Sequence, residues 1–174
     1  MAPWMLLLAL ASIGLPATPS GPAATTGFQR LTQLAGEWKG TYEWSGARSD
    51  RGPVRASYHL TGNGSALVEE LVMNGAPTMT SVYHLDRDEL RVTHYCAAGN
   101  QPRLRASSTN LEIWQIQFSF VDITNLKTPD SPHVDGLTIR SPGSNVLEVL
   151  FQFNTGSGRS VERLSLTKVR GKSS

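Results

Sequence analysis

Hydrophobic and polar positions alternate with a period of two over most of the chain after residue 37. In the run 38–44 the even positions are aromatic or glycine and the odd positions are polar, and the same alternation returns in 54–60. This period is typical of β-strands that bury one face. The alternation and the turns between the runs predict ten strands, at 38–44, 54–60, 66–73, 78–85, 89–96, 103–108, 111–121, 133–140, 146–153 and 160–170.

Turn-forming residues separate these runs. Asn74-Gly75 is the strongest hairpin signal, because both residues tolerate a positive φ. The Gly- and Asn-containing segment 61–64 predicts a second turn. The segment 122–132 contains two prolines and is predicted to be a loop.

A short helix is expected before the first strand. Thr25 or Thr26 supplies a cap for its first turn, and Gly36 ends it. Three apolar residues at intervals of three then form one buried stripe: Phe28, Leu31 and Leu34.

One helix followed by ten strands, with no alternation of strands and helices, predicts an all-β fold. Antiparallel strands joined by short turns protect their edges most simply by closing on themselves. We therefore expect a single up-and-down antiparallel β-barrel over residues 25–170, preceded by the short N-terminal helix. A sandwich of two sheets is the alternative, and residues 171–174 are expected to form a disordered tail.

The first residues have the character of a secretory signal peptide. The segment from Met5 to Leu15 is apolar over eleven residues, too short to span a bilayer, and small and Pro-rich residues follow it. Residues 1–24 are interpreted as a signal peptide cleaved near 20–24, although Lys and Arg are missing from its first four positions. The mature protein is then exported, periplasmic or extracellular. No later stretch reaches eighteen apolar residues, so we expect no membrane span in the mature chain.

Composition excludes some function classes. The 174 residues include 16 Lys and Arg against 14 Asp and Glu, a net charge of +2 without long runs of one sign. Such a balance does not indicate a nucleic-acid partner. The single cysteine, Cys96, excludes an internal disulfide and paired-cysteine metal or redox sites. We expect its thiol to be buried, because a free thiol in an oxidising compartment needs protection.

The segment Gly36-Glu37-Trp38, placed after a short helix, resembles the Gly-x-Trp start of lipocalins and related calycin barrels. The direct step from helix to strand is also similar to nitrobindin-like barrels, but their haem-ligand motif is missing. The resemblance implies a barrel whose Trp38 closes one end against an arginine near the last strand, either Arg163 or Arg170. The run from His94 to Pro102 (HYCAAGNQP) resembles uncharacterised secreted bacterial proteins and implies no activity.

His94 and Cys96 share the apolar face of their strand and are the first candidates for chemistry. Imidazole and thiolate are ligands for haem or a soft metal, but two ligands are too few. A Cys-His nucleophile is disfavoured, because neighbouring same-face side chains on a strand point in parallel. A core histidine beside a small apolar cysteine is the simpler interpretation.

A carboxylate and several aromatic residues are candidates for holding a ligand. Either Glu69 or Glu70 faces inward, and an inward Glu69 needs a partner such as an arginine or a tyrosine. Gln115 and Gln117 are expected to face solvent, because the opposite face of their strand carries the bulky apolar residues. The candidate ligand-binding residues are Tyr42, Trp44, Tyr58, Glu69, Tyr83, His94, Cys96, Asn100, Gln101 and Arg103.

These observations favour a lipocalin-like protein that binds a small hydrophobic or amphipathic molecule inside the barrel. A haem- or metal-dependent enzyme or sensor that uses His94 is one alternative, and a structural or interaction module without an internal ligand is another. Neither a Gly-x-Ser-x-Gly nor a His-Glu-x-x-His motif is present, so no catalytic or metal residue is assigned. The sequence specifies neither a cofactor nor an oligomeric state.

Overall fold

A computed structural model describes residues 21–156 and 158–170. Most of the expected signal peptide and the expected tail at 171–174 lie outside these residues. The described chain consists of one helix and ten strands: α1 (Pro22–Thr32), β1 (Gly36–Gly46), β2 (Asp50–Thr61), β3 (Ala66–Met73), β4 (Ala76–Asp86), β5 (Glu89–Tyr95), β6 (Gln101–Asn110), β7 (Gln115–Thr124), β8 (His133–Gly143), β9 (Val146–Asn154) and β10 (Arg159–Lys168).

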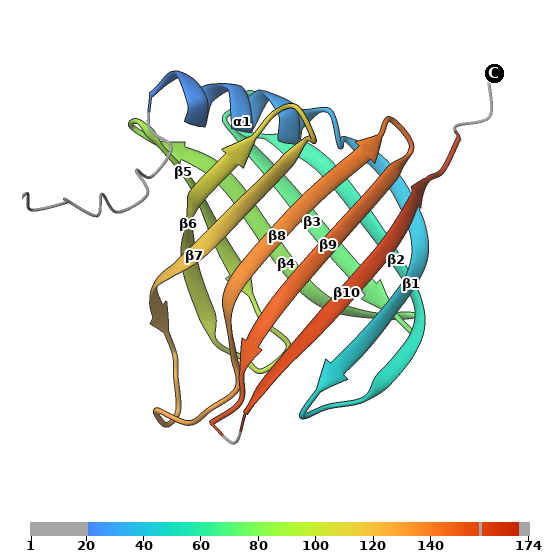
Figure 1. Cartoon of the computed structure of the whole chain (residues 1–174), viewed down its shortest axis with the longest axis vertical. Coiled ribbons are helices and arrows are strands. Elements are labelled where there is room, and N and C mark those ends of the chain that lie inside the picture. Colours follow the sequence, from blue (N-terminus) through green and yellow to red (C-terminus); the bar gives the residue numbers. More distant parts are fainter. Residues whose placement is uncertain (1–20, 157, 171–174) are drawn as a thin grey trace, which may run out of the picture.

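The ten strands form a closed antiparallel barrel (Figure 1). Each strand pairs with its neighbours in sequence, and β1 pairs with β10 to close the barrel. The predicted up-and-down barrel is confirmed, and the alternative sandwich is wrong. Closure follows from the alternating pattern: one face of every strand is apolar, and a closed sheet buries all these faces in one interior without an edge.

The structure corrects two predicted boundaries. The helix begins at Pro22 after Gly21, so Thr25 and Thr26 lie inside it and do not cap it. The predicted strand 111–121 begins only at Gln115, because residues 111–114 form a turn in which Trp114 has a φ of 47°. Gln115 and Gln117 face outward as expected, since the inward positions of β7 carry Ile116 and Phe118.

Helix α1 lies across one end of the barrel (Figure 1). Trp38, which is 1% exposed, holds it there through an indole N–H that donates to the carbonyl of Leu34 at 2.7 Å. The ammonium of Lys168 lies 5.3 Å from the centre of the Trp38 ring. A lysine thus takes the place of the expected arginine: Lys168 stands opposite Trp38 in the register, whereas Arg163 is exposed opposite Glu43 and Arg170 is exposed after the end of β10.

The opposite end, called the mouth below, carries the loops β1–β2, β3–β4, β5–β6, β7–β8 and β9–β10 (Figure 1). Near the mouth two strand pairs separate early. β5 and β6 are paired only from Arg91 to Thr93 on β5, and β7 and β8 only from Gln115 to Ser119 on β7. Side chains at the mouth therefore have more room than those beneath α1.

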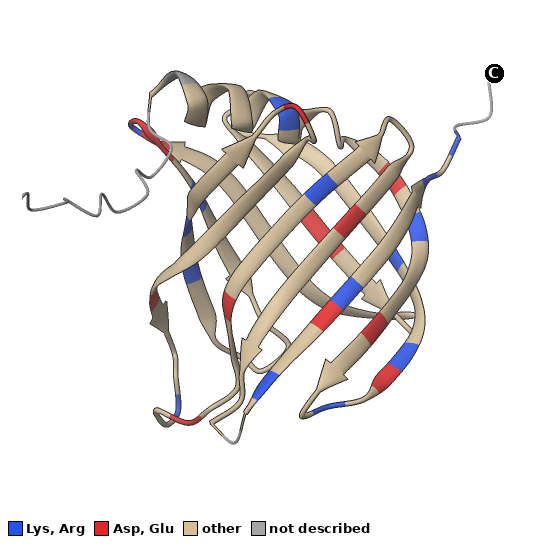
Figure 2. Cartoon of the chain, in the orientation of Figure 1, with Lys and Arg blue, Asp and Glu red and all other residues tan. Residues whose placement is uncertain are grey.

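The charged residues are spread over the barrel wall. Figure 2 shows Lys and Arg interspersed with Asp and Glu along the strands that face the viewer, so that this side of the barrel carries both signs. In the part of the chain that the structure describes, no helix has the length and apolar character needed to cross a bilayer.

Candidate ligand-binding site

A cavity of about 530 Å³ opens at the mouth. Apolar and aromatic side chains form most of its wall, among them Trp44, Met73, Met79, Cys96, Pro132 and Phe153. Arg48, Asp50 and Glu162 bring charge to the same cavity. Its lining comes from both sides of the barrel, from β1 and β10 as well as from the loops after β5 and β7, so only the closed fold assembles it.

Two aromatic residues from neighbouring parts of the barrel form one wall. The ring centres of Trp44 and Phe153 lie 4.6 Å apart, with the planes tilted by 46°. Tyr42 is held beside them because Gly52 faces it in the register and leaves space for the ring; a Cβ at Gly52 would lie 2.9 Å from a carbon of that ring. The Tyr42 hydroxyl accepts a hydrogen bond from Asn74 at 2.8 Å.

Arg48 stands at the entrance. Its guanidinium lies 4.3 Å from the centre of the Trp44 ring and pairs with Asp50 at 3.1 Å. That pairing holds the pKa of Asp50 below its ordinary value. Because the Arg48 and Asp50 side chains are 55% and 42% exposed, the pair adds little to stability.

Glu162 is the most unusual polar group of the cavity. It is completely buried, and among the described residues neither carboxyl oxygen makes a regular hydrogen bond, although the Trp44 indole approaches the carboxyl. Burial raises the pKa of Glu162 to about 7, although the Trp44 indole and the charge of Arg48 partly offset the rise. A buried carboxyl with so few partners is costly, and this one lines a cavity.

Sequence reasoning missed Glu162, although the signal was present. Glu162 lies on the same face of β10 as the buried Leu164 and Leu166, because the three residues are two positions apart. Glu69 shares a face of β3 with Leu67 and Leu71 in the same way. The alternation on β10 therefore predicts that Glu162 faces inward, whereas both faces of β3 are apolar and the sequence leaves Glu69 or Glu70 open. Arg48 and Asp50 carry no such signal, because they lie in and directly after the β1–β2 turn.

A second polar group lies deeper in the barrel, in a row across β2, β3, β4 and β5. Glu69 faces inward and is completely buried. It accepts hydrogen bonds from the hydroxyls of Tyr58 at 2.5 Å and Tyr83 at 3.1 Å. Burial raises the pKa of Glu69, and the hydroxyls of Tyr58, Ser81 and Tyr83 offset part of the rise. These residues satisfy one another and make a polar layer within the core.

His94 ends this row. One ring nitrogen, Nδ1, lies 2.9 Å from the Ser81 hydroxyl, and the ring packs against Phe151 with 4.9 Å between centres. Burial lowers the pKa of His94 to about 3, so the ring is neutral at ordinary pH. Within residues 21–156 and 158–170, no three His, Cys, Asp or Glu side chains come together as a metal site. The enclosed position of His94 fits a core histidine.

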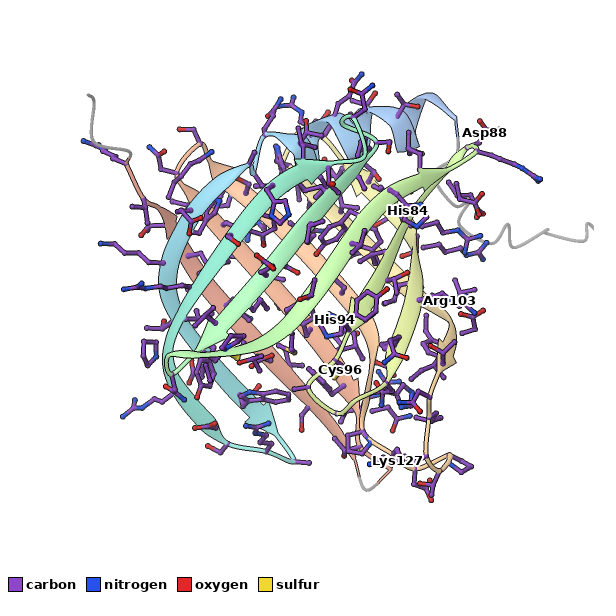
Figure 3. The ribbon with its side chains drawn as sticks, turned by 180° about the vertical axis from the view of Figure 1, so that it is seen from behind. His84, Asp88, His94, Cys96, Arg103 and Lys127 are labelled. Atoms are coloured by element: carbon purple, nitrogen blue, oxygen red, sulfur yellow. The ribbon has the colours of Figure 1, made fainter. Side chains whose placement is uncertain are left out.

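Cys96 follows directly after β5 and lines the mouth cavity. Figure 3 shows His94 in the interior, with Cys96 below it on the side of the mouth. The thiol is 9% exposed, which confirms its expected burial, and its sulfur accepts a weak hydrogen bond from the N–H of Ala98 at 3.5 Å. Because burial also raises the pKa of Cys96, the thiol is a poor nucleophile.

Three other candidates lie outside the cavity. Asn100 is buried and joins two loops at the mouth by donating to the carbonyl of Pro132 at 2.8 Å. Gln101 is half-buried and bonds to neighbouring loop and strand residues. Arg103 points outward and makes two hydrogen bonds to Asp122 (Figure 3), so tyrosines and not an arginine are the partners of Glu69.

The ten candidates thus fall into separate groups. The mouth cavity contains three of them, Tyr42, Trp44 and Cys96. Four others belong to the inner polar row, namely Tyr58, Glu69, Tyr83 and His94. The sequence therefore identified inward-facing residues correctly in most cases, while their distribution along the barrel axis required the structure.

Comparison with known proteins identifies the fold alone. No family model matches the chain, and no curated protein has a significant match to it. Among solved structures, Rv2717c from M. tuberculosis is similar with a TM-score of 0.59 and 17% identity, over 86% of this chain and 99% of that protein. A protein of unknown function from the DUF3598 family of Nostoc punctiforme gives a TM-score of 0.53 at 12% identity, over 80% of this chain and 49% of that protein. This chain is therefore a closed ten-stranded barrel with known structural relatives.

Proposed function

We propose that the protein is an exported binding protein that holds a small amphipathic molecule in the mouth cavity. The observation that carries this proposal is that the buried carboxyl of Glu162 lines the same cavity as an apolar, aromatic wall. A core that served stability alone would gain from an apolar residue in place of a buried carboxyl with so few partners. A bound molecule with an apolar body and one polar group would fill the space and satisfy the carboxyl.

The size of the cavity supports this proposal. A volume of about 530 Å³ falls within the range of about 300–1,000 Å³ that is usual for small-molecule sites. Lipocalins hold one small ligand in a barrel of eight strands, and the ten strands here leave comparable or greater room. The opening at the mouth provides an entry path, whereas α1 covers the other end.

The proposal is tested by titration with N-phenyl-1-naphthylamine, an apolar dye that becomes fluorescent in apolar sites. We expect saturable binding by the wild-type protein and at least tenfold weaker binding by Met79→Trp, because Met79 lines the cavity and a larger ring fills it. Leu60→Trp is the matched control, since Leu60 is 45% exposed near the closed end and its replacement adds the same indole. Equal binding by both variants, or no binding by the wild type, would contradict the proposal.

A further inference from the structure

We propose that the ligand of the mouth cavity is an organic cation, an amine whose ammonium group sits between the carboxylate of Glu162 and the rings of Trp44 and Phe153. This inference rests on the proposed function and adds the chemical class of the ligand. Three observations lead to it: the carboxyl with few partners, the aromatic wall beside it, and the distribution of charge around the cavity.

The carboxyl has fewer donors than it can accept. Both oxygens of Glu162 are buried, and among the described residues the Trp44 indole approaches the carboxyl without forming a regular hydrogen bond with either oxygen. An ammonium group offers up to three donors and a compensating charge, so one ligand group can satisfy the carboxylate. The cation of the protein at this cavity, Arg48, is already paired with Asp50.

The aromatic wall is suited to a positive charge. The faces of Trp and Phe rings attract cations, most strongly when the cation is removed from water. Trp44 already has such a contact, since the guanidinium of Arg48 lies 4.3 Å from its ring centre. Phe153 packs at 4.6 Å from Trp44 and is also part of the cavity wall. An ammonium close to Glu162 would therefore meet a carboxylate on one side and ring faces on the other.

The opposite ligand charge fits poorly. A carboxylate ligand would face Glu162 and Asp50 together, and the repulsion between like charges in a buried site is large. A neutral alcohol can donate to the ionised carboxylate or accept from the protonated carboxyl, but in neither case does it compensate the charge. Amine, alcohol and carboxylate ligands are therefore separated by how their affinities depend on pH.

The charged and titratable groups that act on Glu162 are Arg48 from the β1–β2 turn and Asp50 at the start of β2, with Cys96 across the cavity. The pKa of Asp50 lies below its ordinary value, and the pKa of Cys96 lies above its own. Glu162, with a pKa of about 7, is therefore the group of this set that titrates between pH 5.5 and 8.5. An ammonium needs the ionised carboxylate, so its affinity rises with pH over this window by about 30-fold.

The experiment compares three probes with one chain length, octylamine, 1-octanol and octanoate, by isothermal titration at pH 5.5, 7.0 and 8.5. We expect octylamine to bind at least tenfold more tightly than the other two at pH 8.5, and to lose about 30-fold in affinity at pH 5.5. Glu162→Gln should remove both the preference and the pH dependence. Glu43→Gln, which changes an exposed carboxyl on β1, should retain both.

The outcomes separate this inference from the proposed function. If octanol or octanoate binds as tightly as octylamine, or if octylamine affinity stays flat or falls as pH rises, the cation is excluded while the cavity remains a binding site. If the naphthylamine dye binds and octylamine does not, the cation is likewise excluded while the cavity remains a binding site. If neither the dye nor any of the three probes binds, the proposed function itself fails.

Discussion

Glu162→Gln is expected to raise the free energy of unfolding by about 3 kcal/mol at pH 8 and to leave it nearly unchanged at pH 4. The folded protein holds a proton on Glu162 up to a pKa of about 7, whereas the unfolded chain releases it near the ordinary value of 4.5. The contribution of Glu162 to the free energy of unfolding is therefore fully present below pH 4.5 and is lost as the pH rises through 7. Glutamine has no proton to lose, so the variant escapes this loss.

Urea unfolding at pH 4 and pH 8 measures the effect, which corresponds to a rise of roughly 9 °C in Tm for a chain of this size. Glu69 also has a raised pKa, so its contribution to stability falls as the pH rises. This contribution is the same in the wild type and in the variant, and it cancels when the two are compared. Glu43→Gln controls for the loss of one surface charge. A variant that is no more stable than the wild type at pH 8 would mean that the carboxylate has a partner within the protein.

Trp38→Ala is expected to cost about 3–5 kcal/mol, the usual range for removing a large buried aromatic side chain. The substitution opens a cavity beneath α1 and removes the donor that bonds the carbonyl of Leu34. It also removes the ring over which the ammonium of Lys168 lies. The helix should consequently lose protection against hydrogen exchange more than the strands do.

Trp114→Ala is the matched control, because Trp114 lies at the same end of the barrel but is only half-buried. We expect it to cost clearly less than Trp38→Ala and to leave the exchange of α1 largely unaffected. Equal costs for the two variants, or a loss below about 1 kcal/mol for Trp38→Ala, would show that Trp38 does not hold the helix on the barrel.

The fold was accessible from the sequence because every strand of a closed barrel has one buried face, and a period of two reports that face directly. The hairpin at Asn74-Gly75 was equally clear, and both residues have positive φ in the structure. The start of β7 was misplaced although the alternation changes phase there: the apolar residues Leu111 and Ile113 hold odd positions, and from Trp114 onward they hold even positions. The turn lies at this change of phase, where Trp114 has a positive φ.

The candidate site was only partly accessible. The alternation of apolar and polar positions placed His94 inside and would have placed Glu162 there too, whereas it left Glu69 or Glu70 open. The alternation gives no position along the barrel axis, however, and that position decides that Glu69 is hydrogen-bonded by Tyr58 and Tyr83 while Glu162 lies at a cavity. The register of β1 with β10 brings Trp44 opposite Glu162, and this long-range pairing leaves no trace in the local sequence.

The most direct test of ligand binding at the mouth is an NMR titration of ¹⁵N-labelled protein with octylamine at pH 8.5, followed at the indole N–H signals. Trp44 lines the cavity, whereas Trp38 and Trp114 lie at the closed end and serve as internal references. Trp44→Phe assigns the signal. We predict a saturable shift of the Trp44 indole with those of Trp38 and Trp114 unmoved. A stationary Trp44 signal, or equal shifts at both ends of the barrel, would contradict a binding site at the mouth.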